Sequence, residues 1–245
     1  MHLLSLRGGC LKGDMPEALL TQFDRDDDLL NVFWRAMYYD TENKEAEWPG
    51  NILSKKTVIY ADGTISRVGA PVKFAVHPEE LELARRLAKE AAKVMEGVEF
   101  MGGSGQCFLE PFYNTAQDGA AVPARLDPDL IRARFAGTIY AGAEIFVEPM
   151  TEETPWFKRL ASLFNEKEEE DLKILNRWRE MLRWFRAQPD FVDSAFVRIG
   201  DNLEGNLDDP PEEDSEYYGV VMPRVAIGLT KAGSLAGVGG FVVRA

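Results

Sequence analysis

Two long segments of the chain carry apolar residues at spacings of three and four, the pattern of amphipathic helices. The first spans residues 78–96, with Pro78 at a favoured first-turn position and Gly97 where helices commonly end. The second spans residues 167–188 and is ended by Pro189. The predicted buried positions are Leu81, Ala84, Ala88, Ala91 and Met95 in the first helix, and Leu172, Leu175, Trp178 or Arg179, Leu182 and Phe185 in the second.

Shorter helices are predicted where a capping residue precedes a periodic run. They begin at Asp14 and span residues 27–39, 127–135 and 154–164. Because the segment 154–164 almost adjoins the segment 167–188, the two are expected to form a helical hairpin near 154–188, within a possible helical insertion at 151–190.

Alternating apolar and polar residues predict strands elsewhere. Residues 56–67 have the signature of a hairpin, and we expect Asp62-Gly63 to form its type I′ turn. Residues 220–230 and 235–244 are predicted to form a closing hairpin around the turn 231–234. Pro223 indicates that this strand lies at a sheet edge or starts there. Further short strands are expected at residues 3–6, 72–76, 98–101 and 195–199, and a strand or a hairpin at residues 138–147, whereas residues 102–126 show no clear period.

Hairpins therefore dominate the expected strand pairing, which favours an α+β fold: an antiparallel or mixed sheet with helices packed on it. The chain has 245 residues, 45% of them hydrophobic. A chain of this size can bury a sizeable core, so we predict a single globular domain over residues 1–245.

The charge balance narrows the classes of partner. The formal net charge is −13, and the densest basic runs, at residues 85–93 and 177–186, are interleaved with or preceded by acidic residues. A polyanion without a basic patch repels nucleic acid and anionic lipid. We therefore expect neither nucleic-acid binding nor membrane binding, and the oligomeric state stays open.

Few residues are suited to metal or cofactor chemistry. The sequence has two histidines and two cysteines, without a C-x-x-C pair, a phosphate-binding loop or a dinucleotide fingerprint. We expect no metal and no cofactor. No disulfide framework or signal-peptide core is visible, so the cytoplasm is the expected location.

One segment could carry catalysis. Cys107 follows the glycine-rich run 102–105, whose amides could lower the pKa of a thiol and bind an oxyanion. With His77 as base, Cys107 would form a nucleophile–base pair. The alternative is that residues 107–109 begin a buried strand and the glycines form its turn. Whether the chain is an enzyme thus stays open, and the sequence favours a non-enzymatic function.

The most unusual feature is a run of carboxylates in a predicted acidic loop at residues 201–216, which contains no Lys or Arg. It could be a solvated loop, or it could attract a basic partner and raise the association rate. Two tyrosines follow directly, and aromatic side chains are frequent anchors at interfaces. The candidate binding residues are Asp201, Glu204, Asp208, Asp209, Glu212, Glu213, Asp214, Glu216, Tyr217 and Tyr218.

These features lead to one main hypothesis and two alternatives. The main hypothesis is a protein-binding module that engages a basic protein, for example as an acidic inhibitor or immunity-type protein. One alternative is an enzyme with a thiol nucleophile or a carboxylate-based site at residues 102–114. The other is a structural subunit whose glycine-rich closing hairpin adds to a neighbour's sheet edge.

Overall fold

The computed structural model describes residues 52–53, 57–60, 62–67, 70, 77–101, 106–117, 119–203 and 221–243. The strands expected at residues 3–6 and 72–76, and the helices expected at Asp14 and at 27–39, lie outside the described residues.

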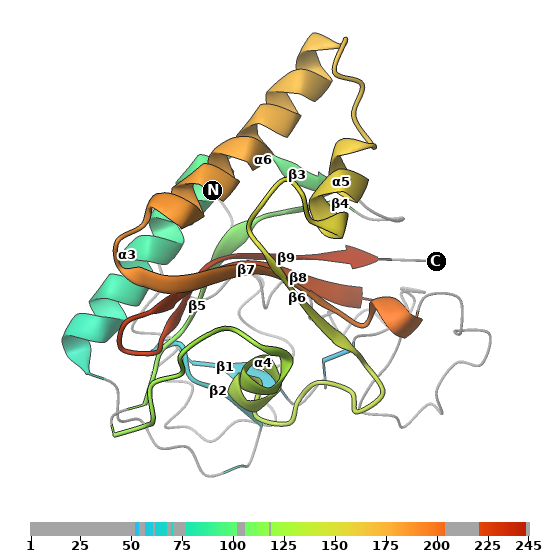
Figure 1. The fold of residues 1–245 in the computed structure, drawn as a ribbon. Helices are drawn as coiled ribbons and strands as arrows, with labels where there is room; N and C mark the ends of the chain where they lie inside the picture. Colours follow the sequence, from blue (N-terminus) through green and yellow to red (C-terminus); the bar gives the residue numbers. More distant parts are fainter. Residues whose placement is uncertain are drawn as a thin grey trace, which may run out of the picture.

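A five-stranded antiparallel sheet forms the centre of the described structure (Figure 1). The strand order is β5-β9-β8-β7-β6, so the hairpin β8–β9 lies in the middle and joins β5 to the pair β6–β7. The fold class predicted from the sequence is confirmed, in its antiparallel form. The strands are β5 (Glu110–Asn114), β6 (Ile145–Pro149), β7 (Phe191–Ile199), β8 (Val221–Thr230) and β9 (Leu235–Val243).

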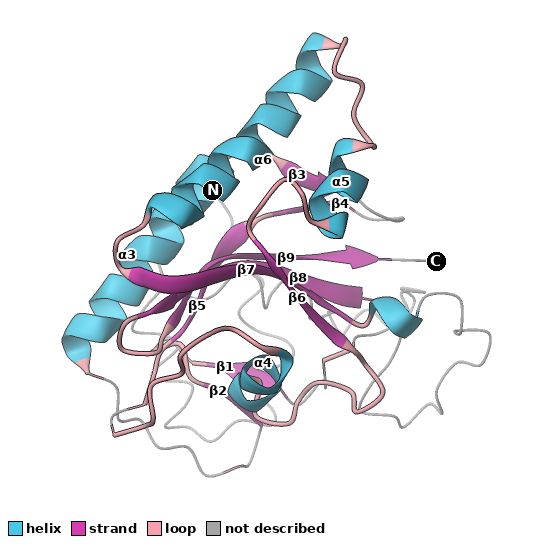
Figure 2. Cartoon of the chain, in the orientation of Figure 1, coloured by secondary structure: helices cyan, strands magenta, loops and turns pink. Residues whose placement is uncertain are grey.

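Helices cover both faces of this sheet (Figure 2). The long helices α3 (Pro78–Val94) and α6 (Glu169–Ala187) lie on one face, with α5 (Pro155–Ala161) beside them, and α4 (Pro128–Arg134) lies on the other. The buried face of α3 packs Ala84 and Leu87 near Tyr113 of β5. On the opposite face Phe112 stacks on Phe135, at the end of α4, with ring centroids 6.3 Å apart.

The two long helices end close to where the sequence predicted. In α3, Ala84, Ala88 and Ala91 are fully buried, and Gly97 takes a left-handed φ of 77° beyond the helix. In α6 the buried stripe runs through Trp178 rather than Arg179, which remains partly exposed. The expected helical hairpin is present as α5 and α6, inserted between the neighbouring strands β6 and β7.

Two small hairpins flank the main sheet. They are β1 (Thr57–Ile59) with β2 (Ile65–Arg67), and β3 (Glu99–Met101) with β4 (Gln106–Phe108). The turn between β1 and β2 differs from the expected type I′ turn. Gly63 has a φ of 80° and donates its N–H to Tyr60 O over 2.9 Å, whereas Asp62 does not take a positive φ. Asp62 instead accepts the N–H of Thr64, which gives the longer hairpin loop in which glycine alone is left-handed.

Of the strand or hairpin expected over residues 138–147, the structure contains the first part of β6 (Ile145–Pro149) and an isolated antiparallel bridge of Ile139 with Leu53. Tyr140 and Ala143 close a turn through an N–H to O bond of 3.0 Å, so β6 begins only at Ile145. The turn contains Gly142, and an alternating pattern alone does not reveal it. Residues 102–126, expected to be irregular, contain β4 and the sheet-edge strand β5.

The closing hairpin occupies the interior of the sheet. Since β8 and β9 both have strand neighbours on each side, the edge position considered for Pro223 is wrong. Pro223 lies near the start of β8, which agrees with the alternative that the strand starts there. The last pair that β8 forms with β7 is Arg224 with Arg198, so Pro223 lies beyond the paired region. The hairpin's edges are therefore used within this chain rather than presented to a neighbour.

Candidate functional site

The predicted binding residues fall almost entirely outside the described residues. Asp201 is the exception: it opens a short 3-10 turn, η2 (Asp201–Leu203), directly after β7. Glu204, Asp208, Asp209, Glu212, Glu213, Asp214, Glu216, Tyr217 and Tyr218 belong to residues 204–220, which the structure does not describe. Among the described residues, η2, which contains Asp201, and the start of β8 at Val221 flank the remaining predicted residues in the sequence.

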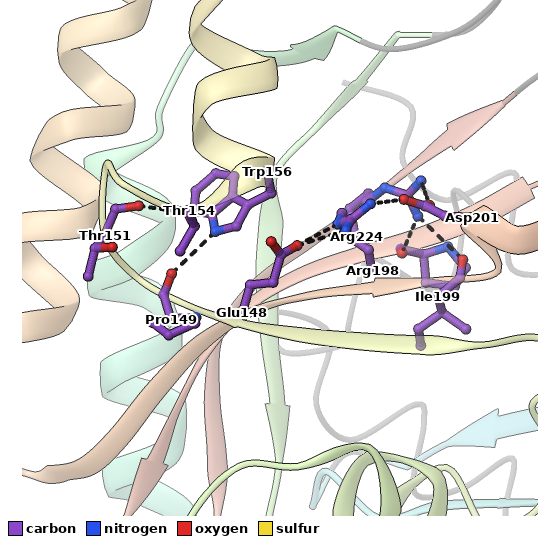
Figure 3. A network of polar contacts seen from close by, with 10 residues as sticks. Glu148, Pro149, Thr151, Thr154, Trp156, Arg198, Ile199, Asp201 and Arg224 are labelled. Carbon is purple, nitrogen blue, oxygen red and sulfur yellow. Dashed lines mark hydrogen bonds and ion pairs between the residues drawn. The ribbon is translucent and has the colours of Figure 1, made fainter.

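Asp201 is held by two arginines (Figure 3). Its Oδ2 accepts a hydrogen bond from Nη1 of Arg198 on β7, and its Oδ1 accepts one from Nη2 of Arg224 on β8. Arg198 also reaches Glu148 on β6, with Nη2 and Nε at 2.7 and 3.0 Å from the same carboxylate oxygen. The four side chains form an ion-pair network across three adjacent strands.

Strand register explains why the network needs its carboxylates. Arg198 and Arg224 are direct cross-strand partners, and side chains directly opposite each other in an antiparallel pair lie about 5 Å apart at Cβ. Two like charges at such a position repel each other. Asp201 lies between them, and Glu148 supplies a second negative charge, so the described part of the chain places two negative side chains beside the two arginines.

The network is largely removed from solvent. The exposed fractions of the side chains are 3% for Arg224, 9% for Asp201, 12% for Arg198 and 16% for Glu148. Nη1 of Arg224 donates further to the main-chain oxygens of Pro223 and Ile199, at 2.9 and 3.3 Å. A buried charge is tolerated only when it is paired and hydrogen-bonded, and this network meets both conditions.

Aromatic side chains pack beside the ion-pair network. Phe196, two residues before Arg198 on the same face of β7, stacks on Trp156 of α5 with centroids 4.1 Å apart. Nε1 of Trp156 donates to Pro149 O at 3.3 Å, which ties α5 to the end of β6 beside Glu148. The guanidinium of Arg198 lies 4.8 Å above the ring of Phe146. These contacts limit the conformations available to Glu148 and Arg198.

The described contacts of this network are ion pairs and hydrogen bonds that join β6, β7 and β8 to η2, an arrangement that stabilises the sheet. The described residues contain no group of three or more His, Cys, Asp or Glu placed to hold a metal ion. None of the described helices has the length and apolar character needed to cross a membrane.

The two residues of the alternative thiol site, His77 and Cys107, lie at the start of α3 and in β4 respectively. His77 is exposed at the start of α3 and makes no capping hydrogen bond through its side chain. The backbone of Cys107 lies in β4, where it pairs with Phe100 of β3, and its side chain is outside the described part. Figure 1 places β4 beyond the far end of α3, a helix about 25 Å long at a rise of about 1.5 Å per residue.

The sequence analysis missed Arg198 and Arg224, although a signal for them was present. Arg224 alternates with Ala226 and Gly228 on a strand whose other face is apolar, and Arg198 lies at the end of another predicted strand. An arginine on a buried strand requires a carboxylate partner. Asp201 follows Arg198 by three residues, which identifies one candidate. Which strand brings Arg224 to the same carboxylate depends on the sheet order, which the sequence does not reveal.

The comparisons with known proteins add no relative. No family model matches the sequence, and no curated protein matches it either.

Proposed function

We propose that this protein binds a basic protein partner in the cytoplasm through the acidic segment, defined as residues 204–216, and the two tyrosines that follow it. The observation that carries the proposal is the concentration of charge. The acidic segment contains seven carboxylates and no Lys or Arg, in a chain whose net charge is −13. Asp201 has a different role in the proposal, because its charge is already compensated by Arg198 and Arg224.

Electrostatic steering is the physical basis of the proposed recognition. A concentrated negative charge on an acidic protein raises the local concentration of a basic partner and suppresses binding to acidic ones. Charge raises the association rate and the selectivity of binding more than it raises the affinity. Tyr217 and Tyr218 would therefore add affinity as aromatic anchors. An acidic inhibitor of a basic enzyme or toxin is one form that such a protein takes. The same charge disfavours nucleic acid as a partner.

Two variants with the same change in net charge test the proposal. In the first, Glu212, Glu213 and Asp214 are replaced by Gln, Gln and Asn. In the matched control, the exposed carboxylates Glu79, Glu96 and Glu168 are each replaced by Gln. Each immobilised protein captures partners from a lysate of its source at roughly 0.05 M and 0.5 M NaCl, because added salt screens exposed charges. Captured proteins are identified by mass spectrometry, and their affinity is measured with purified components.

The expected result is a basic partner that the wild-type protein and the control retain at low salt and the segment variant does not. Its affinity for the segment variant should be lower by about tenfold or more, since a few close charge pairs contribute at least about 1.4 kcal/mol. Equal capture by all three proteins, or partners that are uniformly acidic, would contradict the proposal.

A further inference from the structure

Strand β6 lies at an edge of the five-stranded sheet, since β7 is its only partner among the described strands (Figure 1). The register shows which of its main-chain groups face outward. Gly200 donates its N–H to Glu144 O over 2.9 Å, and these two residues continue the pairing of β7 with β6. Hydrogen-bonded pairs alternate along an antiparallel ladder. The N–H and C=O groups of Ile145 and Val147 therefore point away from β7.

These outward groups form a short open edge. Within the described part of the chain, no hydrogen bond reaches the N–H or the C=O of Ile145 or Val147. The outward positions on either side are closed: Ala143 donates its N–H within a turn at 3.0 Å, and Pro149 has no N–H to donate. Unpaired main-chain groups at the edge of a sheet are a template for a further strand.

We propose that this open edge, defined as the outward groups of Ile145 and Val147, binds an extended segment of a partner protein that has a basic residue at each end of a five-residue stretch. The segment adds to the sheet in antiparallel orientation, as in every other pair of this sheet. Main-chain hydrogen bonds then give affinity, and alternate side chains give selectivity. The open edge is separate from the acidic segment, so the inference goes beyond the proposed function and stands without it.

Two carboxylates favour a basic segment. Glu144, Phe146 and Glu148 project from one face of the strand, because successive side chains alternate between faces. Glu144 is exposed, and its described hydrogen bonds involve the main chain only. Both bonds from Arg198 to Glu148 go to Oε2, and Oε1 has no bond to a described residue (Figure 3). A Lys or Arg opposite each carboxylate would form a favourable cross-strand pair, and the two positions are four residues apart in the incoming strand.

Phe146 determines the residue between the two basic positions. Its ring is half-buried, and the guanidinium of Arg198 lies 4.8 Å from the ring centroid. A third basic residue opposite Phe146 would face that guanidinium, whereas an aromatic or β-branched side chain would pack on the ring. The recognised pattern is therefore basic-x-apolar-x-basic.

The same register argues against a second copy of this chain as the occupant. Two copies of β6 would use both outward residues when Ile145 of each lies opposite Val147 of the other, about a two-fold axis. Glu144 would then face Glu148 twice, and like charges directly opposite each other destabilise a sheet. The net charge of −13 on each copy adds to the repulsion.

A designed peptide tests the inference. The peptide Thr-Lys-Val-Tyr-Val-Lys-Thr, with blocked ends, places its valines opposite Val147 and Ile145 and its lysines opposite the two carboxylates. Fluorescence anisotropy measures its affinity for the full chain at roughly 0.05 M NaCl, where exposed charges are weakly screened. One control peptide has glutamate at both lysine positions. The other is N-methylated at both valines, which removes the N–H groups that would donate to the edge.

Three chain variants complete the test. Val147→Pro removes an outward N–H and leaves the ladder with β7 intact, because proline is tolerated at such an edge position. Glu144→Gln removes one carboxylate of the site. The matched control is Glu96→Gln, an exposed carboxylate beyond the end of α3. Circular dichroism establishes that each variant is folded.

We expect N-methylation of the peptide and Val147→Pro each to weaken binding by about tenfold or more, through lost main-chain hydrogen bonds. Glu144→Gln should weaken it by about threefold, and Glu96→Gln should leave it unchanged. Hydrogen exchange gives an independent readout. The amides of Ile145 and Val147 should exchange quickly in the free protein and slowly with the peptide bound, whereas the amide of Phe146, which bonds β7, is protected in both states.

Several results would overturn the inference. They are no binding at peptide concentrations up to roughly 1 mM, equal affinity for either control peptide, and slow exchange of the Ile145 and Val147 amides in the free protein. If Val147→Pro does not fold, the N-methylated peptide and hydrogen exchange carry the test on the wild-type chain.

Two further outcomes would assign the edge differently. A dimer in analytical ultracentrifugation that Val147→Pro abolishes would show that a second copy occupies the edge, which contradicts the proposal. Peptide binding that is lost on neutralising Glu212, Glu213 and Asp214 but kept in Val147→Pro would also contradict it. Failure of the proposed function is seen elsewhere, in partner capture by the acidic-segment variant, and leaves the affinity for the peptide unaffected.

Discussion

Asp201 illustrates how the environment of a single carboxylate decides its role. In the sequence it is the first of a run of acidic residues. In the structure it lies between two arginines, with 9% of its side chain exposed. A carboxylate in this position stabilises the fold, because its removal takes away a negative charge that bonds two largely buried guanidinium groups.

Asp201→Asn is therefore expected to lower the free energy of unfolding by about 3 kcal/mol, within the usual range for breaking one side of a buried ion pair. Urea denaturation followed by tryptophan fluorescence measures the change. Asp190→Asn, at the more exposed pair with Arg86, should cost less than about 1 kcal/mol. Equal losses in the two variants would show that the network has no special weight in stability.

Tyr60 gives a second prediction at this scale, one that concerns pH. Burial of the phenol raises its pKa above the ordinary value, and the nearby charge of Asp62 adds to the effect. The folded state therefore holds this proton more tightly than the unfolded state. The stability that this tighter proton binding contributes is fully present below the pKa of Tyr60 in the unfolded state, about 10. It is lost as the pH rises from that value through the higher pKa of the folded state.

Consequently, the free energy of unfolding should fall more steeply above pH 10 in the wild-type protein than in Tyr60→Phe. Denaturation curves at a series of alkaline pH values measure the two slopes. Tyr140→Phe is the control, because the side chain of Tyr140 is exposed. If the slope changes as much in the control as in Tyr60→Phe, burial of Tyr60 is not the cause.

At the scale of elements, the central hairpin depends on close approach between its strands. Gly237 of β9 pairs with Ile227 of β8 and with Phe112 of β5. A Cβ atom at this position would lie 2.0 Å from the main-chain oxygen of Ala226. Backbone in the middle of a sheet cannot move aside without losing ladder hydrogen bonds, so a side chain at this position has no room.

Gly237→Ala should accordingly lower the free energy of unfolding by at least about 2 kcal/mol through overpacking. Thermal denaturation followed by circular dichroism provides the measurement. In the control, Gly142→Ala, the new methyl group would meet the side chain of the exposed Tyr140, which can rotate away. A control as unstable as Gly237→Ala would argue against the steric explanation.

Prediction from sequence worked best for elements with a long period or a clear terminator. Helix α3 has a proline at its start and a left-handed glycine after it, and α6 has an uninterrupted apolar stripe. Strands were harder: β5 was hidden in a stretch rich in proline and polar residues, and the turn at Gly142 interrupts an alternation that looks continuous. Sheet order, which brings Arg224 to Asp201, is set by packing between distant segments and leaves no local pattern.

At the scale of the whole molecule, charge is distributed unevenly. The acidic segment contributes seven negative charges to a net charge of −13, without one compensating Lys or Arg. On the helices, by contrast, carboxylates alternate with basic residues, as in the pairs Arg86–Glu90 and Lys173–Glu169. Between Arg198 and Arg224, the sequence therefore contains more carboxylates without an intervening Lys or Arg than in any other stretch of the chain.

This distribution predicts that ionic strength affects partner association more than dissociation. Raising the NaCl concentration from roughly 0.05 M to 0.5 M should lower the association rate constant by about tenfold or more, with a much smaller change in the dissociation rate constant. Surface plasmon resonance with the captured partner measures both constants. A salt effect confined to dissociation would indicate that steering does not contribute.

The central place of β8 and β9 also affects how the protein is made. Strands β5 and β7 are joined in the sheet only through β9 and β8, which lie between them. During translation, the edges of β5 and β7 that pair with β9 and β8 therefore stay unpaired until the chain up to residue 243 has left the ribosome. Such edges are prone to aggregation, so synthesis of this protein should depend on chaperones that protect incomplete nascent chains.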